Sequence, residues 1–176
     1  MSAEAVTNVQ PQEHEHEHRE NFITKYIFST DHKMIAKQYL ITALVMALIG
    51  GVLSSIFRLQ LGYPDQSFPW LENILGKWAE GGSIDPNFYL AMVTMHGTIM
   101  IFFVLTGGLS GTFSNLLIPL QIGARDMASP FMNMLSYWLF FVSSAVMVSS
   151  LFISTGPAAG GWTIYPPLSA LPEAMP

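Results

Sequence analysis

The chain has 176 residues, 51% of them hydrophobic and only 11% charged, with a formal net charge of -5 and a mean hydropathy of +0.39. Soluble domains carry about 25% charged residues, so this composition excludes an ordinary soluble domain and is typical of an integral membrane protein. Cysteine is absent, which excludes disulfides and thiolate metal sites, and the net charge, which is set by a tail and by loops, indicates no particular partner.

The N-terminal part of the chain is polar. Residues 1–21 contain the alternating tract Glu13–His18, which is able to bind a metal ion, but a disordered, solvated His/Glu tail is the interpretation we favour. Residues 22–38 follow, and the amphipathic stretch Phe22–Phe28 at their start predicts a segment that lies at the membrane interface. The first apolar run has no cleavage-site pattern, so we expect no secretory signal peptide.

Three apolar runs predict three transmembrane helices. They cover about residues 39–57, 88–118 and 132–153. Each is long enough to cross about 30 Å of hydrocarbon at 1.5 Å per residue, so we expect an all-α integral membrane protein whose three-helix transmembrane part is 39–153. Small residues recur in the second run at Gly107, Gly111 and Ser114, a spacing that predicts close helix packing.

The segments between the runs indicate an orientation. The loop 59–87 holds Trp70 and Trp78, which could anchor it at the membrane interface, and the residues from 154 to 176 form a Gly- and Pro-rich loop. Basic residues concentrate before the first run and in the link 121–130, which predicts that these parts are inside and that the 154–176 loop is on the outer side. The predicted inner side holds Arg19, Lys25, Lys33, Lys37 and Arg125, and the outer side holds Arg58 and Lys77.

His96 lies eight residues into the second predicted helix, in which no other His, Asp, Glu, Lys or Arg occurs. At that depth, about 12 Å below the surface, an imidazole needs a partner. Two interpretations stay open: a metal ligand, or a histidine hydrogen-bonded to a neighbouring helix. Haem iron accepts axial imidazole, and Gly97 leaves room beside His96 for a flat macrocycle, whose second ligand would come from elsewhere.

Further polar residues lie near the ends of the predicted helices. Arg58 ends the first helix, and taken alone it is best interpreted as a snorkelling anchor, although it could also contact a polar haem substituent. Asp126, in the inner-side link, could collect protons, but taken alone it is better interpreted as a turn or capping residue. Asn115, Asn133 and Ser136 lie near the inner ends, where amides and hydroxyls can hold a chain of waters.

Five stretches, in this order and with this spacing, resemble subunit I of the haem–copper oxidases of the type that contains a D proton channel. The similarity covers about residues 28–176, which makes it far more specific than any single motif. The stretches are Ser29–Lys33, Met95–Phe103, Pro119–Ala128, Asn133–Trp138 and Gly161–Leu168.

The resemblance implies roles for individual residues. His96 matches an axial ligand of the low-spin haem, and Arg58 matches the arginine that meets the formyl group of haem a. Asp126 matches the acid at the entrance of the D channel. Trp162 and Tyr165 match an outer segment near the haem propionates. The matches to channel-lining residues are Tyr39, Asn115, Asn133 and Ser136.

The resemblance also implies that most of the subunit is missing. Subunit I of this family has twelve transmembrane helices, so the chain is either a truncated fragment or one half of a subunit whose remainder is a separate chain. We favour the fragment, because Pro176 falls in a loop. The second ligand of the low-spin haem, and all ligands of the high-spin haem and of copper, would come from the missing part. No catalytic residue is therefore expected in this segment.

The sequence departs from relatives at two sets of positions. Gln60 stands where many relatives have a glutamate that helps to bind a calcium or sodium ion, which puts that ion site in doubt. Quinol-oxidising members carry polar quinone-site residues at positions that are apolar here, which favours cytochrome c as the electron donor. Those positions are Ile49, Leu53, Phe88 and Ala91.

The function that the resemblance implies is that of a respiratory cytochrome c oxidase, which reduces oxygen to water and pumps protons. The implied partners are oxidase subunits II and III, cytochrome c and the lipid bilayer, with no nucleic acid. The implied location is a bacterial cytoplasmic (inner) membrane with the N-terminus in the cytoplasm. The alternatives are a non-catalytic assembly or packing subunit, a nitric oxide reductase relative and a quinol oxidase relative.

Overall fold

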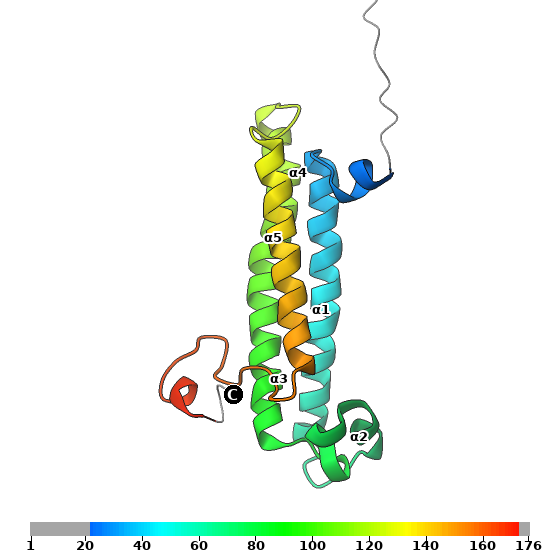
Figure 1. Ribbon diagram of the computed structural model, residues 1–176, viewed down its shortest axis with the longest axis vertical. Helices are drawn as coiled ribbons and strands as arrows, with labels where there is room; N and C mark the ends of the chain where they lie inside the picture. The colour runs from blue at the N-terminus through cyan, green and yellow to red at the C-terminus, as the bar shows by residue number, and fades with distance from the viewer. Residues whose placement is uncertain (1–21, 173–176) are drawn as a thin grey trace, which may run out of the picture.

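The computed structural model describes residues 22–172, and these are helical or irregular, without a strand (Figure 1). Three helical rods lie side by side and alternate in direction. The predicted His/Glu tail, residues 1–21, lies outside the described residues. The elements are η1 (Ile23–Ile27), α1 (His32–Gly62), α2 (Pro69–Leu75), η2 (Gly76–Gly82), α3 (Pro86–Thr98), η3 (Ile99–Leu109), α4 (Ser110–Ile122), α5 (Pro130–Ser149), η4 (Ser150–Phe152) and η5 (Leu168–Ala170).

The predicted all-α membrane fold is confirmed. Three helices are long and apolar enough to cross a membrane: His32–Gly62, Pro86–Ile122 and Pro130–Phe152. We call the two ends of the bundle the His32 end, where α1 begins, and the Pro86 end, where α3 begins (Figure 1).

The first and second helices are longer than the apolar runs that predicted them. Helix α1 begins at His32 because the Asp31 carboxylate accepts hydrogen bonds from the backbone N–H groups of Lys33 and Met34, each at 3.3 Å. The last part of the predicted interfacial segment 22–38 therefore forms the first turns of α1. Hydropathy marks only the apolar centre of such a helix, so its polar ends escape the prediction.

The second rod is continuous through α3, η3 and α4, and η3 is a π-helix. Its glycines allow close approach: a Cβ on Gly108 would collide with Ala43 of α1, and one on Gly111 would collide with the ring of Tyr39. Gly107 lies equally close to the Phe140 ring of α5. The predicted close packing of this helix is thus confirmed.

The loop between the first two rods is folded at the Pro86 end. The indole of Trp78 stacks on Phe88, with ring centroids 4.9 Å apart, so this tryptophan packs against α3, while Trp70 is 45% exposed. Gln60 fastens the loop to α1, since its Oε1 accepts the backbone N–H of Ile84 at 3.3 Å. After α5, the chain returns to the same end, where Lys77 Nζ donates to the carbonyl of Ser154.

Candidate cofactor and proton-transfer sites

His96 is fixed by one hydrogen bond to the neighbouring helix. Its Nδ1 lies 2.8 Å from the backbone oxygen of Gly50 on α1, and the side chain is half-buried. A carbonyl oxygen can only accept, so Nδ1 carries the proton and the neutral ring keeps its lone pair on Nε2. Nε2 has no hydrogen-bond partner within residues 22–172. Both interpretations of His96 are therefore compatible, because the interhelical bond leaves the second nitrogen able to ligate a metal.

Aromatic side chains lie near His96 and near the next residue, Gly97. The Phe57 ring stands edge-on to the imidazole, with centroids 5.8 Å apart. A Cβ on Gly97 would lie 3.1 Å from Cδ1 of Trp162, so the space beside Gly97, which the sequence left open for a macrocycle, is taken by an indole. A planar group that His96 ligates would have to approach from another side of the helix.

The other predicted cofactor contacts are more exposed. The Arg58 guanidinium carbon lies 6.0 Å from the centroid of the Phe57 ring, and within residues 22–172 the side chain has no hydrogen bond or ion pair. Tyr165 is 75% exposed. Of the outer residues predicted near a haem, the structure thus places Trp162 against Gly97, the residue after His96, keeps Arg58 near the Phe57 ring, and leaves Tyr165 at the surface.

Four predicted channel residues form one hydrogen-bonded set near the His32 end. The hydroxyl of Tyr39 on α1 lies 3.0 Å from Oγ of Ser136 on α5, and this Oγ donates to the backbone oxygen of Asn133. Asn133 donates its side-chain amide to the side-chain oxygen of Asn115 on α4, which is 4% exposed and donates in turn to Gly111. These amides and hydroxyls can orient water but carry no titrating proton at neutral pH.

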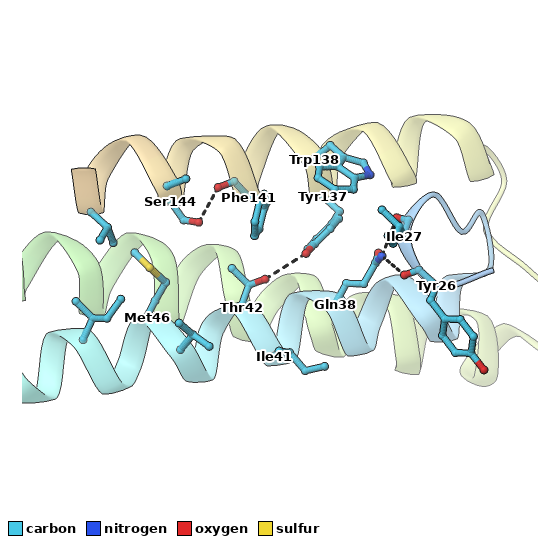
Figure 2. A pocket seen from close by; sticks show the side chains of 14 residues that line it. Tyr26, Ile27, Gln38, Ile41, Thr42, Met46, Tyr137, Trp138, Phe141 and Ser144 are labelled. Carbon is cyan, nitrogen blue, oxygen red and sulfur yellow. Dashed lines mark hydrogen bonds between the residues drawn. The ribbon is translucent and has the colours of Figure 1, made fainter. Parts of the chain in front are cut away.

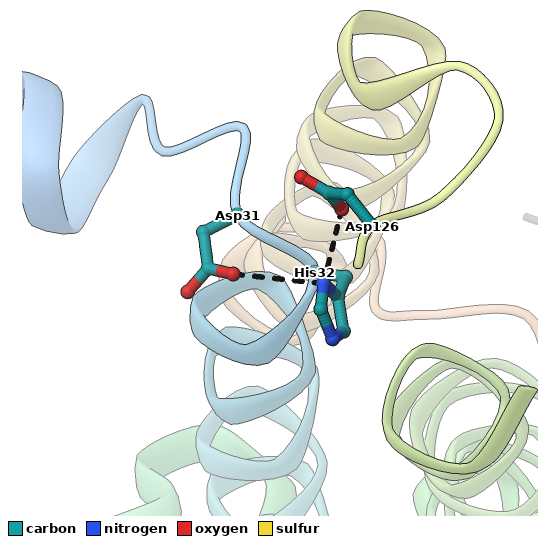
Figure 3. A group of neighbouring side chains, drawn as sticks. All are labelled: Asp31, His32 and Asp126. Atoms are coloured by element: carbon teal, nitrogen blue, oxygen red, sulfur yellow. Dashed lines mark hydrogen bonds and ion pairs between the residues drawn. The ribbon is translucent and has the colours of Figure 1, made fainter. Parts of the chain in front are cut away.

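Asp126 lies apart from that set, beside a buried histidine (Figure 3). Its Oδ1 is 3.0 Å from Nδ1 of His32, a residue 5% exposed at the start of α1, and it also accepts the backbone N–H of Met127 at 2.7 Å. Among the described residues no hydrogen bond links Asp126 to Asn133 or Asn115. The sequence did not reveal His32, and its only signal there was a histidine in the Ser29–Lys33 stretch.

Asp31, His32 and Asp126 form a cluster near the start of α1. Within residues 22–172 it is the one group of three His or acidic side chains whose ligand atoms are close enough to hold a metal ion. Ligand atoms of Asp31, His32 and Asp126 lie within 4.8 Å of one another. The Asp31 carboxylate, however, is engaged by both oxygens in capping α1. We therefore interpret the cluster as a helix cap beside a His–Asp pair.

A groove of about 560 Å³ runs between α1 and α5 (Figure 2). Its walls are mostly apolar, and Gln38 closes one end by donating its amide to the carbonyls of Tyr26 and Ile27 at 2.7 and 2.9 Å. Thr42 and Tyr137 bridge it with hydroxyls 3.3 Å apart. No carboxylate, imidazole or amine lines the groove, so its side chains are unsuited to proton exchange.

Comparison with known proteins gives a consistent set of relatives. The family model described as Cytochrome C and Quinol oxidase polypeptide I matches residues 34–176. The chain is 44% identical over 154 residues to the alternative cytochrome c oxidase subunit 1 of Bradyrhizobium diazoefficiens, covering 88% of this chain and 24% of that protein.

Two further relatives carry similar names. Identity is 42% over 146 residues with the cytochrome c oxidase subunit 1 of Thermostichus vulcanus, covering 83% of this chain and 23% of that protein. Identity is 38% over 173 residues with the cytochrome c oxidase subunit 1 of Cereibacter sphaeroides, covering 89% of this chain and 31% of that protein. The chain thus spans about a quarter to a third of the length of these relatives.

Proposed function

The chain belongs to the cytochrome c and quinol oxidase polypeptide I family, and from this we propose that it is a three-helix part of the catalytic subunit of a cytochrome c oxidase. Members of this haem–copper oxidase family are membrane oxidoreductases. The complete enzyme would take electrons from cytochrome c, reduce oxygen to water and pump protons. This segment would contribute one ligand of the low-spin haem and the first part of a proton path.

The single observation that carries the proposal is the hydrogen bond from His96 Nδ1 to Gly50, which leaves Nε2 without a partner in the described chain. A backbone carbonyl behind a ligating imidazole fixes the tautomer and the ring orientation, as at other metal sites. The side chains present therefore fit an axial haem ligand. When bound, low-spin haem a would supply one-electron transfer.

The other cofactor contacts follow from the same assignment. Arg58 would meet the haem formyl group, and Trp162 and Tyr165 would lie near the propionates. Support comes from the position of the Phe57 ring, which contacts both the Arg58 guanidinium and the His96 imidazole. The high-spin haem, copper and their ligands would come from the remainder of the subunit.

Asp126 would take up protons from the cytoplasm at the His32 end. Tyr39, Ser136, Asn133 and Asn115 would hold the water chain that leads inward, and their mutual hydrogen bonds support this role. Since Asp126 and this set share no direct hydrogen bond within the described residues, transfer between them would need intervening water. The hydrogen bond with His32 would hold the carboxylate at the mouth of the path.

Cytochrome c is the donor that the buried core favours over a quinol. The four positions that differ from quinol-oxidising relatives carry apolar side chains, and they lie in or against the hydrophobic core cluster. A quinone site needs polar partners for its oxygens, which these side chains lack. The four are Ile49, Leu53, Phe88 and Ala91.

The proposed setting is a bacterial cytoplasmic membrane. The N-terminus would face the cytoplasm, oxidase subunits II and III would pack around the complete subunit, and no nucleic acid would be bound. The rival is an assembly or packing subunit without a cofactor, and a nitric oxide reductase relative would lack the polar set around Asn115 and Asn133.

The test is a reduced-minus-oxidised visible spectrum of the purified complex that contains this chain, beside its His96→Ala variant. We expect the low-spin haem band to vanish, because alanine cannot ligate iron. The high-spin haem signal of the same preparation reports that the complex has assembled. His32→Gln, which changes the histidine at the other end of the bundle, should leave the low-spin band in place. An unchanged band in His96→Ala would make the histidine structural and favour the packing subunit.

A further inference from the structure

The segment that follows α5 folds back onto α3, and it forms a hydrogen bond there with the side chain of Thr94. The backbone N–H of Gly161 donates to Oγ1 of Thr94 at 2.9 Å, and that hydroxyl donates its own proton to the carbonyl of Leu90 at 2.8 Å. Thr94 is 7% exposed, so the hydroxyl makes both bonds away from bulk water. A buried hydroxyl that gives one bond and accepts another is fully used, and its loss leaves the Gly161 N–H without that acceptor.

The bond to Thr94 is made by the residue immediately before Trp162. Gly161 turns the chain with φ +80°, a conformation that glycine adopts without strain, and the next residue is Trp162. The Trp162 side chain then reaches Gly97, where an added Cβ would be 3.1 Å from its Cδ1. Thr94 and Gly97 lie one helical turn apart, and His96 stands between them.

No other described hydrogen bond joins the second half of the loop to the helices. Earlier in the loop, Lys77 donates to the carbonyl of Ser154, and Gly156 lies against Trp78. From residue 157 to residue 172, the other described hydrogen bonds join residues within the loop itself. Gly161 to Thr94 is therefore the one described hydrogen bond that fastens this stretch to the helices.

We propose that Thr94 is a positioning residue for the His96 site: its hydroxyl fixes the 157–172 loop so that Trp162 covers the face of α3 next to His96 and keeps water from the ligand. This inference rests on the proposed role of His96 as a haem ligand. The packed surroundings of a metal site control solvent access, and through it the redox potential. Without the bond, water gains access and favours the more positively charged oxidised iron, so the low-spin potential moves to a more negative value.

The test compares three variants in the purified complex. Thr94→Val keeps the side chain's shape and removes the hydroxyl, while Thr94→Ser keeps the hydroxyl. Thr98→Val is the matched control, because Thr98 lies two residues on the other side of His96 and its hydroxyl bonds only within the helix, to the backbone oxygen of Thr94. Two readouts are taken: hydrogen–deuterium exchange of the peptide that contains Gly161, and the midpoint potential of the low-spin haem.

We expect Thr94→Val to exchange roughly tenfold faster at Gly161, as the loss of one hydrogen bond predicts, and to shift the potential to a more negative value. Thr94→Ser and Thr98→Val should match the unchanged protein in both readouts. Unchanged exchange in Thr94→Val would show that the hydrogen bond to Thr94 does not hold the loop. Faster exchange with an unchanged potential would overturn the positioning role. Failure of the haem assignment would appear separately, as an unchanged low-spin band in His96→Ala.

Discussion

At the scale of single residues, the pairing of Asp126 with His32 couples the link before α5 to the start of α1. The two side chains are 94 positions apart in the chain, and their atoms are 3.0 Å apart. His32 is buried, whereas the Asp126 side chain keeps 39% exposure, so the carboxylate can meet water from the His32 end. A carboxylate held by a fixed partner and open to solvent is suited to exchange protons with that solvent.

Replacing Asp126 with asparagine removes this exchange with little change in shape. In the complete oxidase, Asp126→Asn should slow turnover on the order of 100-fold, the scale on which a positioned proton-transfer group contributes, and should weaken proton pumping. The low-spin haem spectrum should not change, because His96 lies toward the Pro86 end of the bundle. Turnover with cytochrome c and proton release in reconstituted vesicles are the measurements.

Asp65→Asn is the control for this variant, since Asp65 is an exposed carboxylate in the loop at the Pro86 end. It should turn over and pump as the unchanged enzyme does. If Asp126→Asn pumped with unchanged stoichiometry, the proposed proton path would be wrong.

At the scale of elements, glycines decide how closely the second rod approaches α1. Gly108 is buried in η3, and an added Cβ would overlap both Ala43 of α1 and the backbone oxygen of Phe103. Neither is the movable end of a flexible side chain, so the helices would have to move apart. Gly51, in α1, offers the contrast, because nothing lies within 4 Å of a Cβ built there.

The variant Gly108→Ala should therefore destabilise the bundle by roughly 1–3 kcal/mol, the usual cost of overpacking a well-packed interior. Gly51→Ala should be neutral or slightly stabilising, because alanine favours the helix over glycine. The measurement is the thermal midpoint of haem release from the complex, followed by absorbance. Equal midpoints for the two alanine variants would contradict the close packing of η3 on α1.

The centres of the three helices could be predicted from the sequence, and several features around them could not. An apolar run reports the hydrocarbon-crossing part of a helix, but the turns that contain Lys33 and Lys37 are polar, so α1 begins earlier than its run. The loop 59–87 carried no periodicity to interpret. It folds through contacts with other segments, such as Trp78 on Phe88 and Gln60 to Ile84, which spacing along the chain does not reveal.

The candidate sites divide in the same way. His96 stood out in the sequence because it is the one residue of the types His, Asp, Glu, Lys and Arg in the second predicted helix, and hydrocarbon makes such a residue costly. Asp126, Asn115, Asn133 and Ser136 also stood out as polar residues near helix ends, and the resemblance favoured a proton-path role over a structural one for them. Two hydrogen bonds could not be predicted from the sequence: the one between His32 and Asp126 and the one from Gly161 to Thr94. Each joins positions more than sixty residues apart and depends on how the helices pack.

At the scale of the whole molecule, the two candidate sites lie toward opposite ends of the bundle. Asp126 and the polar set lie toward the His32 end, while His96, Trp162 and Arg58 lie toward the Pro86 end. The proposed function fits this separation, because it would take protons at one end of the bundle and pass electrons through a haem held toward the other. Apolar side chains on the outer faces of α1 and α5 are exposed between the ends, for example Leu48 at 69% and Val146 at 63%, which suits a surface covered by lipid or by other helices.

The orientation of the bundle can be tested with single cysteines, because the chain has none of its own. Ala128→Cys lies exposed in the link at the His32 end, and Ser67→Cys lies exposed in the loop at the Pro86 end. Basic residues near the ends favour the cytoplasmic side, and Lys25, Lys33, Lys37 and Arg125 all belong to the His32 end. A membrane-impermeant maleimide added to spheroplasts should therefore label Ser67→Cys at once and Ala128→Cys only after the membrane is opened. The cysteine-free chain sets the background, and the reverse pattern would place Asp126 on the outer side, where it could not take protons from the cytoplasm.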